Sequence, residues 1–331
     1  MAGRVSDVVV FAPSPQLTIT IEERDEEPDI HIHAGGQGVW QSRMLRRLGS
    51  TVTLCFTFAG EAGRVLNHIL EDEGFTVASV ERDGQNAAYI HDRRGGMRAP
   101  IVETIGSALP RHVLDELYSL TLREGIDAEL VLLSGPAGDV LPADVYRRLA
   151  ADLRSCRCRV MVDLRGVRLD AALAGHVDIV KISHEELLAD GRIGANESDE
   201  IVAAMRRIRD AGADAVIVTR AEQPLLLLQE DDSVLVVTNP RMEVVDASGA
   251  GDSFTAAVAA MLAQGAELVD AVVLGAAAGA LNVTRHGRGT GDAAAIRQLS
   301  ALVRTTRYGA EVDEVPPSIG LDELPGILEI E

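Results

Sequence analysis

Short apolar runs alternate with amphipathic segments along most of this chain. The runs "AELVLLS", "RVMVDL" and "VDIVKIS" are largely apolar, which is typical of strands buried on both faces. The segments between such runs, for example "ADVYRRLAADLRS" and "IVAAMRRIRDAG", repeat apolar residues every three or four positions, as helices with one buried face do. This alternation predicts βαβ units and a mainly parallel central sheet covered by helices.

Two other regions alternate between apolar and polar residues. They hold "QLTITIE" and "DIHIHA" within about 16–34, and "NAAYIHD" and "MRAPIVE" within about 85–104. Such alternation is typical of half-buried antiparallel strands, and Arg94-Gly95-Gly96 favours a hairpin turn in the second region. We therefore expect a small open sheet of four strands beside the main body. His31 and His33 share one face of such a strand, where we favour a surface pair over metal ligands because no third ligand is near in sequence.

Composition and charge narrow the possible functions. The 331 residues are 47% apolar, which allows a large core, and no apolar run is long enough to cross a bilayer, so we expect a cytoplasmic protein. The formal net charge of −20 disfavours nucleic acid and anionic membranes as partners. Lys181 is the only lysine and no Gly-Lys pair exists, which excludes a Walker A loop. A phosphate ligand would therefore need another local positive feature.

The stretch "MEVVDASGAGDSFTAAVAAML" joins an expected strand, "MEVV", to a strong helix pattern. Gly249, Ala250 and Gly251 have little or no side chain, so backbone N–H groups can approach a ligand closely. The N–H groups at a helix start lack helical partners and can hold phosphate oxygens, while Asp252 could accept a hydroxyl proton. The pattern suggests phosphoryl transfer to an alcohol, but a plain tight turn capped by Asp252 fits the spacing equally well.

Three segments resemble motifs of the ribokinase-like (PfkB) carbohydrate kinases, in the same order. "VVDASGAGDSF" is similar to the signature D-T-x-G-A-G-D, with Ala247 in place of threonine. "AGGQGVWQSRMLRRLGSTVTLCFTFAGEAG" is similar to the N-terminal glycine block, and "VKISHEEL" to K-P-N-x-x-E-L, with Ser183 in place of asparagine. The resemblance covers roughly residues 5–303. "SGPAGDVLPADVYRRL" and "FAPSPQLTI" look most like the 1-phosphofructokinase and tagatose-6-phosphate kinase branch.

The resemblance implies a ribokinase-like three-layer α/β fold, with a mainly parallel central sheet flanked by helices and a small β-sheet lid. We expect a kinase domain over 1–305, with the lid strands at the positions given above, and an acidic, proline-containing extension over 306–331. The implied activity is ATP-dependent phosphorylation of a sugar-like small molecule. ATP and Mg²⁺ are the implied cofactors, with a monovalent cation in some members, and many members form homodimers through the lid.

The resemblance also implies roles for individual residues. Asp252 would be the catalytic base, Gly249, Ala250 and Gly251 the anion hole, and Asp246 and Glu186 would organise magnesium through water. The residues implied at the nucleotide are Thr219, Arg220, Ala221 and Asn282, and those at the acceptor are Gln16, Gly35, Gly36, Gln37, Trp40 and Gln85.

Several acceptor positions depart from the family pattern. Gln16 stands where an aspartate is usual, Gln37 replaces a lysine, Trp40 an asparagine, and Gln85 stands where an arginine would clamp a sugar phosphate. These losses disfavour a phosphosugar unless other arginines face the cleft, and Trp40 would suit an unphosphorylated sugar or nucleoside-like ring. The candidate replacements are Arg43, Arg93, Arg94 and Arg98.

Two hypotheses follow from these departures. One is a kinase that acts on a hydroxyl of a sugar-like molecule. The other is a ligand-binding or regulatory protein that keeps the scaffold but has lost efficient chemistry. Asp252 and its turn favour the kinase.

Overall fold

A ten-stranded sheet forms the centre of the computed structural model, which describes residues 6–25, 27–95, 98–136, 138–284, 289, 291–310 and 318–319. Its strands are β1 (Val8–Phe11), β4 (Val52–Ala59), β5 (Thr76–Arg82), β8 (Leu130–Ser134), β9 (Arg159–Asp163), β10 (Val177–Ser183), β11 (Ala213–Arg220), β12 (Gln223–Leu228), β13 (Val234–Thr238) and β15 (Arg304–Arg307). The strand order is β15-β13-β12-β11-β10-β9-β8-β1-β4-β5. Every pair from β11 to β5 is parallel, and β12, β13 and β15 add an antiparallel edge. The predicted mainly parallel sheet is confirmed.

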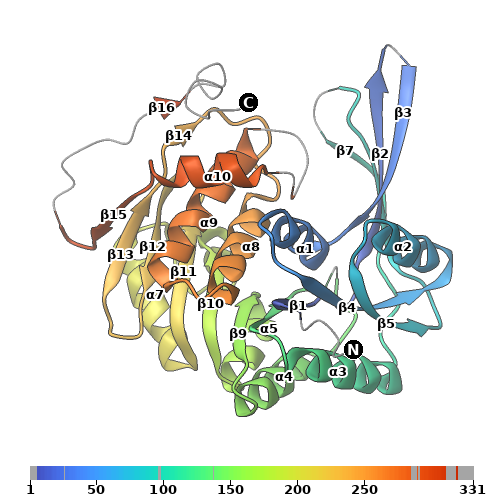
Figure 1. Ribbon diagram of the computed structural model, residues 1–331, viewed down its shortest axis with the longest axis horizontal. Helices are drawn as coiled ribbons and strands as arrows, with labels where there is room; N and C mark the ends of the chain where they lie inside the picture. The colour runs from blue at the N-terminus through green and yellow to red at the C-terminus, as the bar shows by residue number, and fades with distance from the viewer. Residues whose placement is uncertain are drawn as a thin grey trace.

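Helices cover both faces of this sheet (Figure 1). One face carries α1 (Gln37–Arg47), α2 (Gly60–Asp72), α8 (Ala250–Ala263), α9 (Leu268–Val283) and α10 (Ala293–Ser300). The other carries α3 (Arg111–Gly125), α4 (Asp144–Ser155), α5 (Gly166–Ala174), α6 (His184–Ala189) and α7 (Ser198–Asp210). In β1, Val8 and Val10 pack on the first face while Val9 and Phe11 pack on the second. Burial on both faces explains the continuous apolar runs.

A second sheet stands beside α1 and forms the lid (Figure 1). Its strands are β2 (Gln16–Arg24), β3 (Glu27–Gly35), β6 (Ala87–Asp92) and β7 (Ala99–Thr104), in the order β3-β2-β6-β7. All four predicted strands are present, but the expectation of a wholly antiparallel sheet is wrong, because β2 and β6 pair in parallel. Each of these two strands begins a hairpin, and the two hairpins lie side by side in the same direction. Gly96 of the predicted turn lies outside the described residues.

The segment before α8 also differs from the prediction. The sequence predicts a strand through "MEVV", but β14 (Arg241–Met242) ends earlier and pairs with β16 (Ser318–Ile319) instead of joining the central sheet. Val244 and Val245 are 52% and 38% exposed, so neither side chain fills the core. The N–H groups of Val245 and Asp246 bond the carbonyl of Val283 at the end of α9. The expected boundary at 305 falls within β15, and most of the predicted extension lies outside the described residues.

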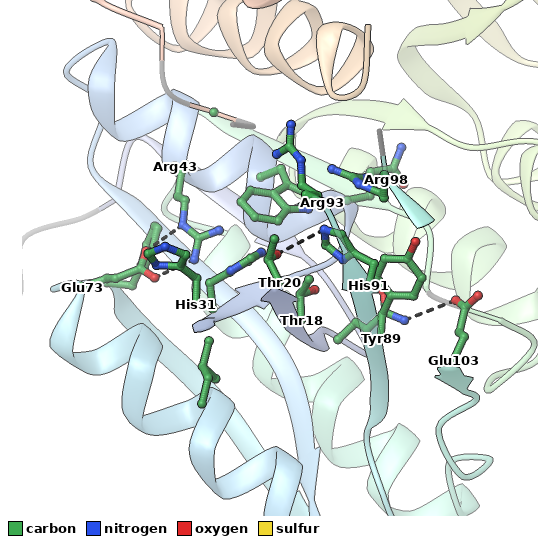
Figure 2. Close-up of a pocket in the computed structure, with 18 of the residues that line it drawn as sticks. Thr18, Thr20, His31, Arg43, Glu73, Tyr89, His91, Arg93, Arg98 and Glu103 are labelled. Atoms are coloured by element: carbon green, nitrogen blue, oxygen red, sulfur yellow. Dashed lines mark hydrogen bonds and ion pairs between the residues drawn. The ribbon is translucent and has the colours of Figure 1, made fainter. Parts of the chain in front are cut away.

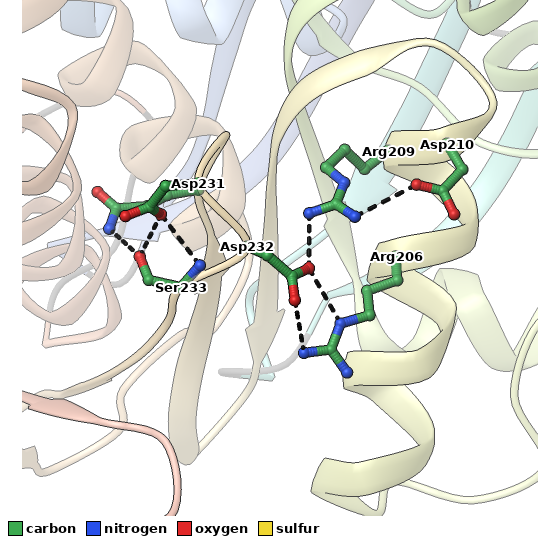
Figure 3. Close-up of polar contacts among 7 residues, drawn as sticks. Arg206, Arg209, Asp210, Asp231, Asp232 and Ser233 are labelled. Atoms are coloured by element: carbon green, nitrogen blue, oxygen red, sulfur yellow. Dashed lines mark hydrogen bonds and ion pairs between the residues drawn. The ribbon is translucent and has the colours of Figure 1, made fainter.

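Charged residues of α7 bind the turn between β12 and β13 of the central sheet. Asp232, in the turn between β12 and β13, accepts hydrogen bonds from Arg206 and Arg209, which also pairs with Asp210 (Figure 3). These contacts fix the antiparallel edge of the sheet to the helix beside it.

Among the described helices, none is both long and apolar enough to cross a membrane.

Candidate active site

The predicted glycine turn lies at the start of α8. Gly249 precedes the helix with φ 85°, a left-handed conformation that favours glycine. Ala250, Gly251 and Asp252 form the first turn, and all four residues are partly exposed. The first N–H groups of a helix lack helical partners and carry partial positive charge. An anion can therefore reach this helix start from solvent.

Asn282 of α9 braces the turn from behind. Its side chain is buried, and its Oδ1 accepts a hydrogen bond from Ser253 Oγ at 2.9 Å. Its Nδ2 donates to the carbonyl of Ser248 at 3.0 Å. These bonds tie both ends of the turn to α9. The predicted contact of Asn282 with a nucleotide stays a prediction.

Lys181 lies directly beneath the turn. It belongs to β10, is 5% exposed, and its Nζ is 3.3 Å from Asp163 Oδ1. A Cβ built on Gly251 would stand 3.1 Å from this Nζ. Burial acts to lower the pKa of Lys181, but Asp163, Glu186 and Asp252 outweigh it and raise that pKa. The ammonium therefore stays charged and places a positive charge directly beneath the turn.

Sequence reasoning used Lys181 only to exclude a Walker A loop and missed its place in the site. Two features of the sequence could have indicated its place in the site. Lys181 is the only lysine, and it lies in a segment that resembles a kinase motif. The partner carboxylate of Asp163 is also buried, and it accepts hydrogen bonds from Gln41 Nε2 at 3.0 Å and Thr255 Oγ1 at 2.8 Å. These bonds link α1, α8, β9 and β10, so the charges beneath the turn are held rigidly.

A cleft of about 1220 Å³ opens between the lid and α1. Its lid side is formed by alternate residues of β2 and β6, Thr18, Thr20, Tyr89 and His91, as Figure 2 shows. The predicted acceptor residues Gln16, Gly36, Gln37 and Trp40 also line the cleft. Gly35 is buried next to Gly36, and Gln85 is exposed on the loop after β5, outside the lining residues.

Uncharged hydrogen-bonding groups and aromatic rings fill much of the cleft wall. Thr20 Oγ1 and His91 Nε2 are 3.2 Å apart, and the His33 ring packs edge-on against Trp40 at 5.5 Å between centroids. Burial, helped by Arg43 and His91, lowers the pKa of His33 to about 4. The His33 imidazole is therefore neutral near pH 7. Gln16 Nε2 donates to Glu103 at 3.3 Å, which brings one carboxylate to this wall.

Three of the four candidate arginines line the cleft. Arg43, Arg93 and Arg98 face it, whereas Arg94 is bound to Asp92 and its side chain is 46% exposed. Arg43 lies 4.5 Å above the Trp40 ring and pairs with Glu73. Positive charge is thus present in the cleft despite Gln37 and Gln85. The sequence alone does not distinguish Arg93 and Arg98 from Arg94, because the folded lid hairpin decides which of these side chains face the cleft.

Three of the four predicted nucleotide residues lie at the end of β11 or directly after it. Thr219 at the end of β11 pairs in register with Ser183 at the end of β10. Arg220 is buried and donates to Asn196 and Ser198, so its guanidinium holds the loop before α7. Ala221 has φ 52°, a conformation that usually favours glycine.

The two predicted magnesium residues flank the turn without forming a complete metal site. Glu186 Oε2 accepts the N–H of Ser183 in a capping box, and Asp246 Oδ1 accepts the N–H of Ser248 at 2.9 Å. Within the described ranges, no three His, Cys, Asp or Glu side chains converge on a point that could hold a metal. This donor set fits magnesium, which keeps much of its water and binds nucleotide phosphates.

Comparisons with known proteins agree with this geometry. The family model for pfkB family carbohydrate kinases matches residues 10–294. The chain is 30% identical over 258 residues to ATP-dependent 6-phosphofructokinase isozyme 2 of Escherichia coli, covering 76% of this chain and 82% of the relative. It is 26% identical to 1-phosphofructokinase of Bacillus subtilis, covering 83% and 89%.

Among solved structures, E. coli phosphofructokinase-2 in complex with potassium matches with a TM-score of 0.80 and 24% identity, covering 89% of this chain and 98% of that one. This likeness confirms the predicted ribokinase-like fold. The family match spans most of the central sheet, the lid and the turn at α8. The chain therefore belongs to the pfkB family of carbohydrate kinases.

Proposed function

We propose that this carbohydrate kinase transfers the γ-phosphoryl group of ATP to a hydroxyl of a sugar or sugar-like acceptor held in the cleft. The observation that carries the proposal is the partly exposed helix start at Gly249–Asp252 with the charged Lys181 beneath it. A fixed cation and backbone N–H groups at one point suit a group whose negative charge moves during reaction.

In the proposed step, the acceptor oxygen bonds to the γ-phosphorus and its proton passes to the Asp252 carboxylate. The bond between that phosphorus and the β–γ bridging oxygen breaks, and ADP leaves with the electron pair. The N–H groups of Gly249, Ala250 and Gly251 stabilise the transferring group, and each lost donor of this kind costs about 10² in rate or more. General base catalysis by Asp252 adds about 10²–10⁴.

Magnesium, when bound, would neutralise phosphate charge during transfer. Asp246 and Glu186 would hold it through water, in keeping with their partly used carboxylates. A potassium requirement belongs to the same proposal, because the E. coli neighbour was solved with potassium.

A phosphorylated sugar is the acceptor to test first. Arg43, Arg93 and Arg98 place positive charge around the cleft, and arginine suits phosphate recognition. The names of the relatives above also refer to phosphofructokinases. These observations weigh against the expectation, drawn from Gln37 and Gln85, that a phosphosugar is disfavoured.

We also propose a homodimer through the lid. The face of the lid opposite the cleft carries exposed apolar side chains, with Ile30 of β3 61% exposed and Val102 of β7 45% exposed. Such a face suits burial against a second copy. Light scattering after gel filtration should give a dimer, and Ile30→Asp should give a monomer that stays folded.

The test of the activity is a panel assay. Purified protein with ATP and Mg²⁺ is incubated with fructose 6-phosphate, fructose 1-phosphate, tagatose 1-phosphate and unphosphorylated sugars and nucleosides, and products are identified by mass spectrometry. We expect ADP and one phosphorylated product. Calorimetric binding of a panel member without any product would instead favour the ligand-binding alternative.

A further inference from the structure

The lid hairpin meets the kinase body at Arg93. This residue follows β6, and its N–H bonds the carbonyl of Ile21 at 2.8 Å, which fixes its backbone to β2. Its Nη2 lies 3.8 Å from Asp246 Oδ2, and its Nη1 lies 3.7 Å from Glu22 Oε1. The side chain is only 13% exposed. A lid cation therefore reaches across the cleft to the segment that leads into the glycine turn.

Asp246 marks the side of the cleft where phosphate would bind. It opens the turn, and its carboxylate accepts the N–H of Ser248. Burial acts to raise the pKa of Asp246, but the bonds from Ser248 and the charges of Arg98 and Arg93 lower it. The contacts of Arg93 with Glu22 and Asp246 are longer than hydrogen bonds, so the attraction within these pairs is mainly Coulombic. An incoming phosphate could compete with such pairs.

Arg94 provides a built-in comparison. It is the next residue along the chain, yet its guanidinium bonds Asp92 within the lid, with Nη2 2.6 Å from Asp92 Oδ2. Its side chain lies outside the cleft lining and is 46% exposed. Two adjacent arginines on one hairpin thus differ in direction, and Figure 2 shows Arg93 beside Arg98 in the cleft.

We propose that Arg93 is a catalytic residue of the lid, which contacts the γ-phosphoryl group of ATP during its transfer to the acceptor. This inference rests on the proposed kinase function. The guanidinium donates hydrogen bonds to the phosphoryl oxygens and exchanges no proton, so the bonds made and broken are those already described. Its planar fork matches these oxygens better than an ammonium would. Because Arg93 belongs to the lid and lies 3.8 Å from Asp246, the lid holds its charge beside the segment that leads into the glycine turn.

Three variants test the role in turnover: Arg93→Gln, Arg93→Lys and, as the matched control, Arg94→Gln. With the best acceptor from the panel, we expect Arg93→Gln to lower kcat by about 10²–10³ while the KM values for ATP and acceptor change less than about threefold. Arg93→Lys should recover little of this loss. Arg94→Gln should match the wild type.

A binding measurement tests the same contact without turnover. Trp40 is the only tryptophan and lines the cleft, so its fluorescence can follow binding of MgADP with and without aluminium fluoride, a mimic of the transferring phosphoryl group. Wild type and Arg94→Gln should bind MgADP at least tenfold more tightly with aluminium fluoride. Arg93→Gln should keep its MgADP affinity and lose this gain.

Three outcomes would overturn the assignment. Unchanged kcat in Arg93→Gln would remove Arg93 from catalysis. A raised KM for a phosphorylated acceptor with unchanged kcat would make it an acceptor-binding residue. An undiminished aluminium fluoride gain would place it away from the phosphoryl group. Failure of the wild type to bind MgATP or to form any product would instead refute the proposed kinase function itself, and that result needs no variant.

Discussion

The two sides of the candidate site are built in different ways. At the phosphoryl side, backbone N–H groups stand over a buried pair, Lys181 and Asp163, that is bonded to neighbouring helices. At the acceptor side, side chains from β2, β3, β6 and α1 surround an open cleft of about 1220 Å³. The first arrangement is rigid because Lys181 and Asp163 are buried, paired with each other and hydrogen-bonded to α1 and α8. The second can change its chemistry one side chain at a time, which suits a scaffold that serves different acceptors.

Removing the Lys181 charge should have the largest effect. Lys181→Met leaves Asp163 buried and unpaired, so we expect a loss of about 3–5 kcal/mol in the free energy of unfolding, measured with urea, and severe loss of turnover. The double variant Lys181→Met, Asp163→Asn removes both charges and should recover most of the stability. Turnover of the double variant should stay at least ~10² below wild type. If the double variant turned over as fast as wild type, the Lys181–Asp163 pair would have only a structural role, and the phosphoryl side would not depend on its charge.

The acceptor side should respond to pH through His33. The pKa of this histidine is lowered from its usual 6.5 to about 4, so the folded state resists its protonation. Its contribution to stability is complete above about pH 6.5 and is lost as the pH falls towards 4. We expect about 2 kcal/mol of destabilisation between pH 7 and 4.5 from this group. His33→Asn should flatten the profile in this window and His68→Asn, at an exposed site on α2, should not; equal profiles for all three proteins would contradict the role of His33.

Ala221 should give the smallest effect. Its left-handed backbone strains an alanine, so Ala221→Gly should raise stability by about 1 kcal/mol or less after the extra entropy of glycine in the unfolded chain is counted. Ala301, exposed with φ −65°, is the control, and Ala301→Gly should lower stability. Thermal unfolding of the two variants would decide, and a lower Tm for Ala221→Gly would show that its backbone is unstrained.

The sequence predicts the two sides of the site unequally well. The turn at 249–252 follows from a local pattern, because glycines, an acid and a helix are adjacent in the chain. The cleft depends on which faces of separate strands turn together, so Arg93 and Arg94 look equivalent in sequence and differ only in the folded hairpin. Strand positions were predicted well from alternation. The parallel pairing of β2 with β6 was not, since alternation says which face is buried but not which strands are neighbours.

The early end of β14 has a similar cause. The run "MEVV" predicts a strand, yet here the N–H of Val245 bonds the end of α9, and the side chains of Val244 and Val245 stay exposed. Local composition cannot reveal such a partner, because it lies about forty residues away in the chain.

The most direct test of the phosphoryl side is the turnover of Asp252→Asn, which keeps the shape of the side chain and removes its capacity as a base. Measured with the best acceptor under saturating MgATP, kcat should fall by at least ~10², while MgATP binding followed through Trp40 fluorescence changes less than about twofold. An Asp252→Asn protein that turns over as fast as wild type would contradict the account of how this kinase takes the proton from its acceptor.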